Sequence, residues 1–189
     1  MNLAEALREH AYLEGDFVLR SGRRSSYYLD KYRFETRPDL LGPLGKRIAE
    51  AVAEVEPDAV RLAGPELGAV ALAAAASLAS GLPFLIVRKD AKEYGTANRL
   101  EGVFEPGELA CLVEDVVTSG GAAIAAVEAL REAGLEVGNA VCVVDREEGG
   151  ADALAAAGVH LRPLFLVSEL AGTQKAQQNR MVEPKGHTC

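Results

Sequence analysis

Short, continuously apolar segments alternate with longer helix-like segments along most of this chain, and this alternation constrains the fold more than any other feature. The segments AVRLAG (59–64), LACLVED (109–115) and NAVCVVDR (139–146) are each followed by a stretch of helical composition. Continuous apolar strands joined by helical crossovers are typical of a parallel sheet that is covered on both faces. The sequence therefore predicts an α/β fold with a Rossmann-like parallel sheet between two layers of helices.

The remaining segments complete this pattern. The predicted elements are a helix at 4–13, two short strands around a turn at Gly22 within 16–34, a helix from about 39 to 55, helices at 65–81, 119–134 and 151–158, strands at 83–88 and 159–167, and a closing helix at 168–181. Pro65 is expected in the first turn of its helix. Segment 89–108 lacks apolar periodicity and is long for a connection, which is typical of a functional loop or lid.

The charge balance excludes several classes of partner. The chain has 20 Lys and Arg residues against 28 Asp and Glu residues, a formal net charge of −8. This balance argues against a broad surface for nucleic acid or for an anionic membrane. A polyanionic ligand would therefore have to be bound by a local group of basic side chains.

The cysteines and the most apolar stretch indicate a cytoplasmic protein. Cys111 and Cys142 lie in predicted strands, Cys189 is the last residue, and no CxxC spacing suggests a zinc site. An odd number of cysteines fits a reducing compartment. Segment 68–87 is apolar but is interrupted by serine, glycine and proline, so it predicts a buried helix and a strand rather than a membrane span.

Two adjacent carboxylates, Glu114 and Asp115, occur where a predicted core strand (109–113) ends. The following turn, 118–122, supplies two hydroxyls, two glycines and the N–H groups of a helix start, which together suit a phosphate monoester. The carboxylates would repel that phosphate, so we expect them to face sugar hydroxyls or a magnesium ion. The implied ligand is a ribose 5-phosphate; the alternative is a polar strand end with an ordinary serine cap.

The segment CLVEDVVTSGGA (111–122) resembles the phosphoribosyl-pyrophosphate motif of type I phosphoribosyltransferases. This resemblance implies a single domain, 1–189, with an N-terminal hairpin or hood at about 1–36, a core at 37–170, and a C-terminal helix and tail at 171–189. The residues it implies for binding phosphoribosyl pyrophosphate within the motif are Glu114, Asp115, Val116, Val117, Thr118, Ser119, Gly120, Gly121 and Ala122.

Three other segments resemble the orotate phosphoribosyltransferases of this family. They are the hairpin FVLRSGRRSSYYLDKYRF (17–34), the loop VRKDAKEYG (87–95) and the strand end VVDREEGG (143–150). The resemblance implies that Arg146 holds the carboxylate of orotate, which fits the ability of arginine to bind a carboxylate through two hydrogen bonds. Thr118 is also expected to contact orotate.

The hairpin supplies further candidates for orotate binding. Arg20 stands where the family often has a lysine that reaches the substrate. Tyr28 and Leu29 stand where bulky residues flank the pyrimidine ring, although Tyr28 could equally be a core aromatic. Lys31 could contact orotate or could be an ordinary surface lysine.

The loop concentrates positive charge for a pyrophosphate. Arg88, Lys89 and Lys92 fall within five residues, and Tyr94 stands where many family members have histidine. A tyrosine hydroxyl can donate a hydrogen bond but carries no positive charge near neutral pH. Lys92 is therefore expected to stabilise the leaving group. A second departure from some members is Leu67–Gly68 in place of a lysine, which favours backbone contacts there.

The resemblance implies a reaction and an assembly. Orotate would displace pyrophosphate from C1 of the ribose, with Lys92, Asp115 and Glu114 as the catalytic residues and Mg²⁺ held mainly by the substrate rather than by the protein. The loop is implied to close over the site of a neighbouring subunit in a homodimer.

Three alternatives compete with this interpretation. One is a phosphoribosyltransferase for another base, against which the hairpin and Arg146 argue. Another is a regulator that senses phosphoribosyl pyrophosphate, which would be expected to lose the loop cations or to carry a nucleic-acid-binding extension. The third is a flavodoxin-like binding module, which does not explain the acidic pair and the basic loop together.

Overall fold

Six strands form the central sheet of this computed structural model, which describes residues 2–18, 22, 24–89 and 99–172. Their order is β5-β4-β3-β6-β7-β8, and all neighbours are parallel except β4 and β5. The strands are β3 (Arg61–Pro65), β4 (Phe84–Val87), β5 (Leu100–Glu101), β6 (Ala110–Val117), β7 (Asn139–Asp145) and β8 (His160–Leu166). The predicted parallel sheet is thus confirmed.

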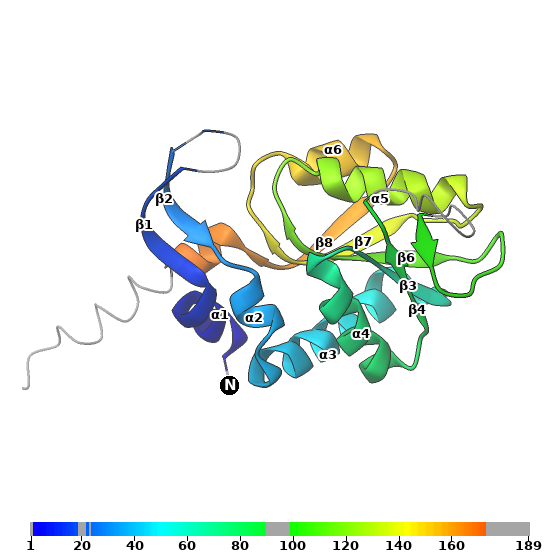
Figure 1. Cartoon of the computed structure of the whole chain (residues 1–189), viewed down its shortest axis with the longest axis horizontal. Helices are drawn as coiled ribbons and strands as arrows, with labels where there is room; N and C mark the ends of the chain where they lie inside the picture. Colours follow the sequence, from blue (N-terminus) through cyan, green and yellow to red (C-terminus); the bar gives the residue numbers. More distant parts are fainter. Residues whose placement is uncertain (1, 19–21, 23, 90–98, 173–189) are drawn as a thin grey trace, which may run out of the picture.

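Helices cover both faces of the sheet (Figure 1). Helices α3 (Pro38–Val55) and α4 (Gly68–Ser80) pack on one face, and α5 (Gly121–Glu132) and α6 (Gly150–Ala156) lie on the other. Each face has its own hydrophobic cluster, because the strands are apolar on both sides. Cys111 and Cys142 are fully buried, one in each cluster, as the sequence predicted, and Cys189 lies outside the described residues.

The N-terminal part forms a small lobe beside the sheet (Figure 1). It consists of α1 (Leu3–Ala11), the antiparallel hairpin of β1 (Tyr12–Val18) and β2 (Arg24–Leu29), and the short helix α2 (Tyr32–Glu35). The prediction of a strand-like segment through 34 was wrong, because the chain turns into α2 and buries Phe34 completely. The predicted first helix also ends earlier, at Ala11, where β1 begins to pair with β2.

Two further boundaries differ from the prediction. Pro65 is the last residue of β3, opposite Val87, and not the first turn of a helix. The backbone N–H of Glu66 still donates to Val87 O (2.8 Å), so α4 begins only at Gly68. The predicted loop 89–108 contains the short strand β5, which pairs with the end of β4. In the structure, the carboxyl ends of β3 and β4 therefore lie at the same edge of the sheet as the carboxyl end of β6.

The described chain continues into a helical segment at 167–172 that packs against the N-terminal lobe. The guanidinium of Arg8 in α1 donates to Leu170 O at 2.8 Å, and Leu170 is fully buried. The start of the predicted closing helix is confirmed, and its remainder lies outside the described residues. No helix in the described ranges combines the length and the apolar character that a membrane span requires.

Candidate functional site

The acidic pair Glu114–Asp115 lies inside β6. The prediction that the strand ends at Val113 was wrong, because β6 stays in register with β7 as far as Val117. Both side chains are consequently almost buried, with exposed fractions of 6% for Glu114 and 4% for Asp115. Buried carboxylates require partners, so the surroundings of this pair define the site.

The alternation of side chains along β6 changes at this pair. Val113 and Val116 both pack against the same hydrophobic cluster, although strict alternation would place them on opposite faces of the sheet. Two backbone N–H groups donate to the acidic side chains themselves, from Asp115 N to Glu114 Oε2 at 3.1 Å and from Val116 N to Asp115 Oδ1. The local twist lets two adjacent strand residues take part in one polar cluster.

Lys31 and Glu35 complete this cluster from the N-terminal lobe. Lys31 Nζ donates to Asp115 Oδ2, and Glu35 is 4% exposed with no hydrogen-bond partner for its Oε1 among the described residues. Burial, together with the charge of Asp115, raises the pKa of Glu35 and that of Glu114 to about 8 each. Burial lowers the pKa of Lys31, but its bond to Asp115 outweighs this and leaves the pKa raised. Lys31 is therefore no ordinary surface lysine.

Gly68, the first residue of α4, touches this ion pair. A Cβ atom at position 68 would overlap Asp115 Oδ2 and Lys31 Nζ. Only glycine allows the helix start to approach the acidic strand so closely. Gly68 thus has a steric role in the site. The neighbouring Leu67 side chain points away from the core, with an exposed fraction of 72%.

The turn 118–122 joins β6 to α5 and leaves the start of α5 open. Gly120 is the N-cap residue in the left-handed conformation (φ 82°), and no side chain caps the helix. The alternative of an ordinary serine cap is therefore wrong. Ser119, Gly121 and Ala122 are exposed, whereas the Val117 side chain is buried in the core. Free N–H groups at an exposed helix start suit a phosphate.

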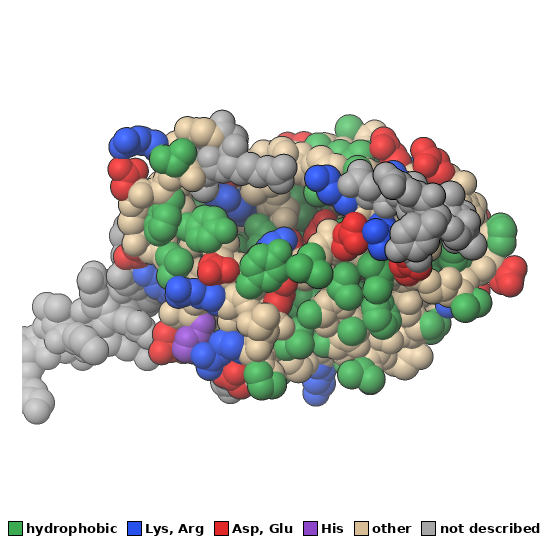
Figure 2. Space-filling model, viewed as in Figure 1, with side chains coloured by type: hydrophobic (Ala, Val, Ile, Leu, Met, Phe, Trp, Pro, Cys, Tyr) green, Lys and Arg blue, Asp and Glu red, His purple; other side chains and the backbone are tan. Residues whose placement is uncertain are grey.

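A cavity of about 420 Å³ opens beside this turn and is lined by four cationic side chains, Lys31, Arg88, Lys89 and Arg99. Figure 2 shows acidic and basic side chains meeting in a hollow beside the N-terminal lobe. Arg88 lies 3.7 Å from Glu101, and Lys89 N donates to Glu66 Oε1 at 2.8 Å. So many cations around one cavity in an acidic protein indicate a polyanionic ligand.

Sequence reasoning missed Arg99, which lies in the middle of the predicted loop 89–108 and lines the cavity. Its carbonyl accepts from Arg88 N (2.7 Å), which fixes the two residues side by side. Its buried Nε has no hydrogen-bond partner among the described residues. The pairing of β4 with β5, which the sequence pattern did not reveal, brings Arg99 next to Arg88.

Arg146 follows β7 and lies beside the phosphate-type turn. Its backbone N donates to Val117 O at 2.9 Å, one residue before Thr118. The guanidinium bonds Tyr27 Oη through Nε at 3.2 Å and Glu148 at 3.0 Å, and only 10% of the side chain is exposed. The expected position at a strand end is confirmed.

The other predicted residues divide into two groups. Tyr28 is 43% exposed and its ring lies 5.7 Å from that of Phe17, so the alternative of a core aromatic is wrong. Leu29 is buried. Arg20, Lys92 and Tyr94 lie outside the described residues.

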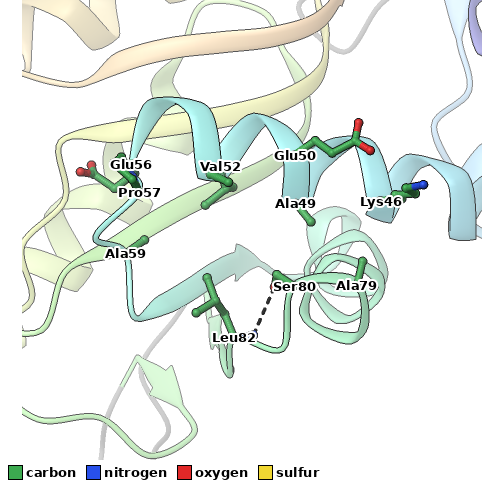
Figure 3. Close-up of a pocket in the computed structure, with 11 residues that line it drawn as sticks. Lys46, Ala49, Glu50, Val52, Glu56, Pro57, Ala59, Ala79, Ser80 and Leu82 are labelled. Atoms are coloured by element: carbon green, nitrogen blue, oxygen red, sulfur yellow. Dashed lines mark hydrogen bonds between the residues drawn. The ribbon is translucent and has the colours of Figure 1, made fainter.

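A second cavity, of about 400 Å³, lies at the opposite end of β3 (Figure 3). It is bounded by α3, the end of α4 and the chain that leads into β3, with Val52, Ala59 and Leu82 on its walls. Ligands in such sheets bind beyond the carboxyl ends of the strands, and this cavity lies at the amino ends. Its lining is largely apolar, with Lys46, Glu50 and Glu56 among the lining residues.

The described residues contain no group of three or more His, Cys, Asp or Glu side chains arranged to hold a metal ion. Asp115 is the carboxylate best placed to approach a metal, but it already pairs with Lys31. These donors fit a metal that takes most of its ligands from a substrate.

Comparison with models of known protein families found no match. The chain is 50% identical to an orotate phosphoribosyltransferase of Methanocella arvoryzae, over 90% of this chain and 96% of that protein. It is similar to the crystal structure of an orotate phosphoribosyltransferase from Aeropyrum pernix, with a TM-score of 0.79 and 30% identity over 92% of this chain and 99% of that one. It is also similar to the Mycobacterium tuberculosis orotate phosphoribosyltransferase in complex with 5-phospho-α-D-ribosyl 1-diphosphate, with a TM-score of 0.76 and 32% identity over 89% and 96% of the two chains.

Proposed function

Because the chain belongs to the orotate phosphoribosyltransferase family, and so transfers ribose 5-phosphate to orotate in pyrimidine biosynthesis, we propose which of its residues carry the reaction. The turn 118–122 binds the 5-phosphate through backbone N–H groups and the hydroxyls of Thr118 and Ser119. Asp115 and Glu114 bind the ribose hydroxyls. The cavity lined by Arg88, Lys89 and Arg99 takes the pyrophosphate.

Arg146 binds the carboxylate of orotate. The observation that supports this assignment is the hydrogen bond from Arg146 N to Val117 O, which brings the backbone of Arg146 next to the phosphate-type turn. Orotate therefore lies between Arg146 and the ribose, with Thr118 near both. Tyr28 and Arg20 of the hairpin cover the pyrimidine, and Lys31 reaches it once its bond to Asp115 opens.

In the transfer, N1 of the orotate anion forms a bond to C1 of the ribose while the bond from C1 to the pyrophosphate oxygen breaks. The pyrophosphate leaves with the electron pair of that bond. C1 gains positive charge in between, and the carboxylate of Asp115, together with that of Glu114 when it is ionised, offsets this charge. Lys92 and Tyr94, which lie outside the described residues, are proposed from the sequence alone to stabilise the departing pyrophosphate.

Magnesium is proposed as the cofactor, held mainly by the pyrophosphate and the ribose hydroxyls. When bound, it neutralises charge on the leaving group. Asp115 is the side chain of this chain that would lie next to it.

Spectrophotometric measurement of orotate consumption, with phosphoribosyl pyrophosphate and magnesium, tests these assignments. Arg146→Ala should raise the KM for orotate and leave the KM for phosphoribosyl pyrophosphate near its wild-type value. Lys92→Ala should lower kcat. Lys46→Ala, in an exposed position of α3, is the control for loss of a positive charge. An unchanged KM for orotate in Arg146→Ala would refute the carboxylate assignment.

A cytoplasmic homodimer is proposed as the active form, with each loop closing over the partner's site. The exposed apolar side chains of Leu67 (72%) and Tyr32 (46%), both close to the site, support a contact there. At an orotate concentration far below the KM of Arg146→Ala, mixing the impaired variants Lys92→Ala and Arg146→Ala should then give more activity than either alone, because some dimers contain one intact site. If mixing restores no activity although the subunits exchange, the shared site is wrong.

A further inference from the structure

The guanidinium of Arg146 is held on three sides by protein groups. Its Nε donates to Tyr27 Oη at 3.2 Å, one terminal nitrogen bonds Glu148 at 3.0 Å, and the Tyr27 ring covers one face with its centroid 4.9 Å from the guanidinium carbon. A guanidinium has five N–H groups. Among the described residues, the N–H group of Nε and one N–H group of a terminal nitrogen have partners, so the terminal nitrogens keep N–H groups that can donate two parallel hydrogen bonds along their shared edge.

Tyr27 is itself fixed by a stack that crosses the N-terminal lobe. Its ring stacks on that of Tyr12 with the centroids 5.0 Å apart and the planes 8° apart. The guanidinium of Arg8 lies 5.2 Å from the centroid of the Tyr12 ring and is anchored by its bonds to Glu14 and to Leu170 O. The order of the stack is thus cation, ring, ring, cation, with Arg8 at one end and Arg146, whose backbone bonds Val117 O, at the other.

The hairpin register explains why these residues meet. Tyr27 on β2 pairs with Glu14 on β1, and Tyr12 pairs with Leu29, so the two tyrosines are diagonal neighbours on the hairpin. Stacked aromatic rings are stiff, and a flat guanidinium packs well on a ring face. The stacked tyrosine rings of the lobe therefore form a rigid surface. The guanidinium of Arg146 can pack flat on this surface in only one orientation of its plane.

We propose that Tyr27 is a positioning residue that fixes the plane of Arg146, so that the free edge of the guanidinium receives a carboxylate, and that it thereby sets the preference of the enzyme for a carboxylated pyrimidine. This inference rests on the proposed contact of Arg146 with orotate. Tyr27 does not touch the substrate in this arrangement. It restricts an arginine that would otherwise rotate among several orientations, each binding a carboxylate less well.

The test uses Tyr27→Phe, which keeps the ring and removes the hydrogen bond to Nε, and Tyr27→Leu, which removes both. Tyr27→Phe is expected to raise the KM for orotate about fivefold, and Tyr27→Leu about twentyfold, the order expected for loss of one or two contacts to a charged group. The KM for phosphoribosyl pyrophosphate and the melting temperature of Tyr27→Phe should stay near wild type. Tyr12→Phe is the matched control, because it keeps the stack and no hydrogen bond to the Tyr12 hydroxyl occurs in the described part of the chain.

A double-mutant cycle with Arg146→Ala distinguishes the positioning role of Tyr27 from the carboxylate-binding role of Arg146. If Arg146→Ala raises the KM for orotate and Tyr27→Phe adds nothing in that background, Tyr27 acts through Arg146. Uracil, which lacks the carboxylate, should react equally poorly with wild type and Tyr27→Leu. If Arg146→Ala raises the KM for orotate but Tyr27→Phe and Tyr27→Leu do not, the positioning role is wrong while the function of Arg146 stands. If Arg146→Ala has no effect on that KM, the proposed contact fails and the inference is overturned with it.

Discussion

Lys31 and Asp115 form an ion pair across the boundary between the N-terminal lobe and the central sheet. Lys31 precedes α2, Asp115 lies in β6, and both are proposed to contact substrate. Asp115 is nearly buried and the Lys31 side chain is only 34% exposed, so the pair lies at the floor of the site. Asp115, proposed to bind the ribose hydroxyls, is therefore neutralised by a cation from the neighbouring lobe.

Replacement of Lys31 by methionine should lower both stability and activity. The change leaves Asp115 and Glu35 together without their cation, and breaking a largely buried pair in this way is strongly destabilising. We expect the melting temperature at pH 7 to fall by several degrees and kcat/KM to fall at least about tenfold. Calorimetry and the orotate assay measure the two effects. Lys46→Met is the control for a general effect of charge.

A double variant distinguishes repulsion between the carboxylates of Asp115 and Glu35 from a general loss of folding. At pH 8 and above, where Glu35 begins to ionise beside Asp115, the additional change Glu35→Gln in Lys31→Met should recover part of the lost melting temperature but little activity. Recovery of both would mean that Lys31 has only a structural role. Recovery of neither would show that the carboxylates are not coupled through Lys31.

The stability of the free enzyme should fall as the pH rises from about 4.5 to about 8. Burial raises the pKa of Glu35 and of Glu114 from 4.5 to about 8. Between these values the folded protein binds more protons than the unfolded chain, so each unit of pH reduces the free energy of unfolding. The contribution is fully present below about 4.5 and is lost as the pH passes through about 8.

Glu35→Gln tests this pH dependence. The amide cannot ionise, so the melting temperature of the variant should decline less steeply between pH 5 and pH 8 and should exceed that of wild type by about 4 °C at pH 8. Thermal melts in matched buffers of constant ionic strength give the two slopes. Glu50→Gln, at an exposed position of α3, should leave the slope unchanged. Parallel slopes for Glu35→Gln and wild type would contradict the raised pKa.

Much of the fold follows from local pattern, and the exceptions have physical causes. The apolar runs at β6 and β7 and the glycine-rich start of α5 were predicted because each signal is contained in a few neighbouring residues. Pro65 was placed in a helix because its local preference fits a helix start, whereas the pairing of β3 with β4 holds it in the sheet. That pairing involves residues more than twenty positions apart and leaves no local trace.

The residues of the site likewise fall into those that a local pattern predicted and those that depend on packing. The acidic pair, the phosphate-type turn and Arg146 were predicted, since strand ends in a parallel sheet meet at one edge. Arg99 and Glu35 were missed, because their roles depend on which elements pack against them. The depth of burial of Asp115 was also missed, as it depends on the approach of Gly68.

Gly68→Ala should therefore disrupt the site although alanine is usually favoured in helices. The added methyl group would overlap the carboxylate of Asp115 and the amine of Lys31, which must move apart. We expect kcat/KM for phosphoribosyl pyrophosphate to fall about a hundredfold, as small misplacements of positioning groups do in other enzymes. Gly42→Ala in α3 has no atom within 4 Å of the new Cβ and should gain about 1 kcal/mol of stability with unchanged kinetics. Wild-type kinetics in Gly68→Ala would show that the approach of α4 is not required.

Arg99→Ala should weaken the binding of phosphoribosyl pyrophosphate and leave the binding of orotate unchanged. Arg99 lines the cationic cavity, and its buried Nε has no partner in the described part of the structure, so a pyrophosphate oxygen would satisfy it. Loss of one charge-assisted contact predicts a rise in the KM for phosphoribosyl pyrophosphate of about tenfold. Because the contact is electrostatic, added salt should narrow the difference between variant and wild type. Arg47→Ala, which removes an arginine that is 54% exposed on α3, is the control. Equal values of this KM in Arg99→Ala and wild type would remove Arg99 from the binding site and leave the pyrophosphate to Arg88, Lys89 and Lys92.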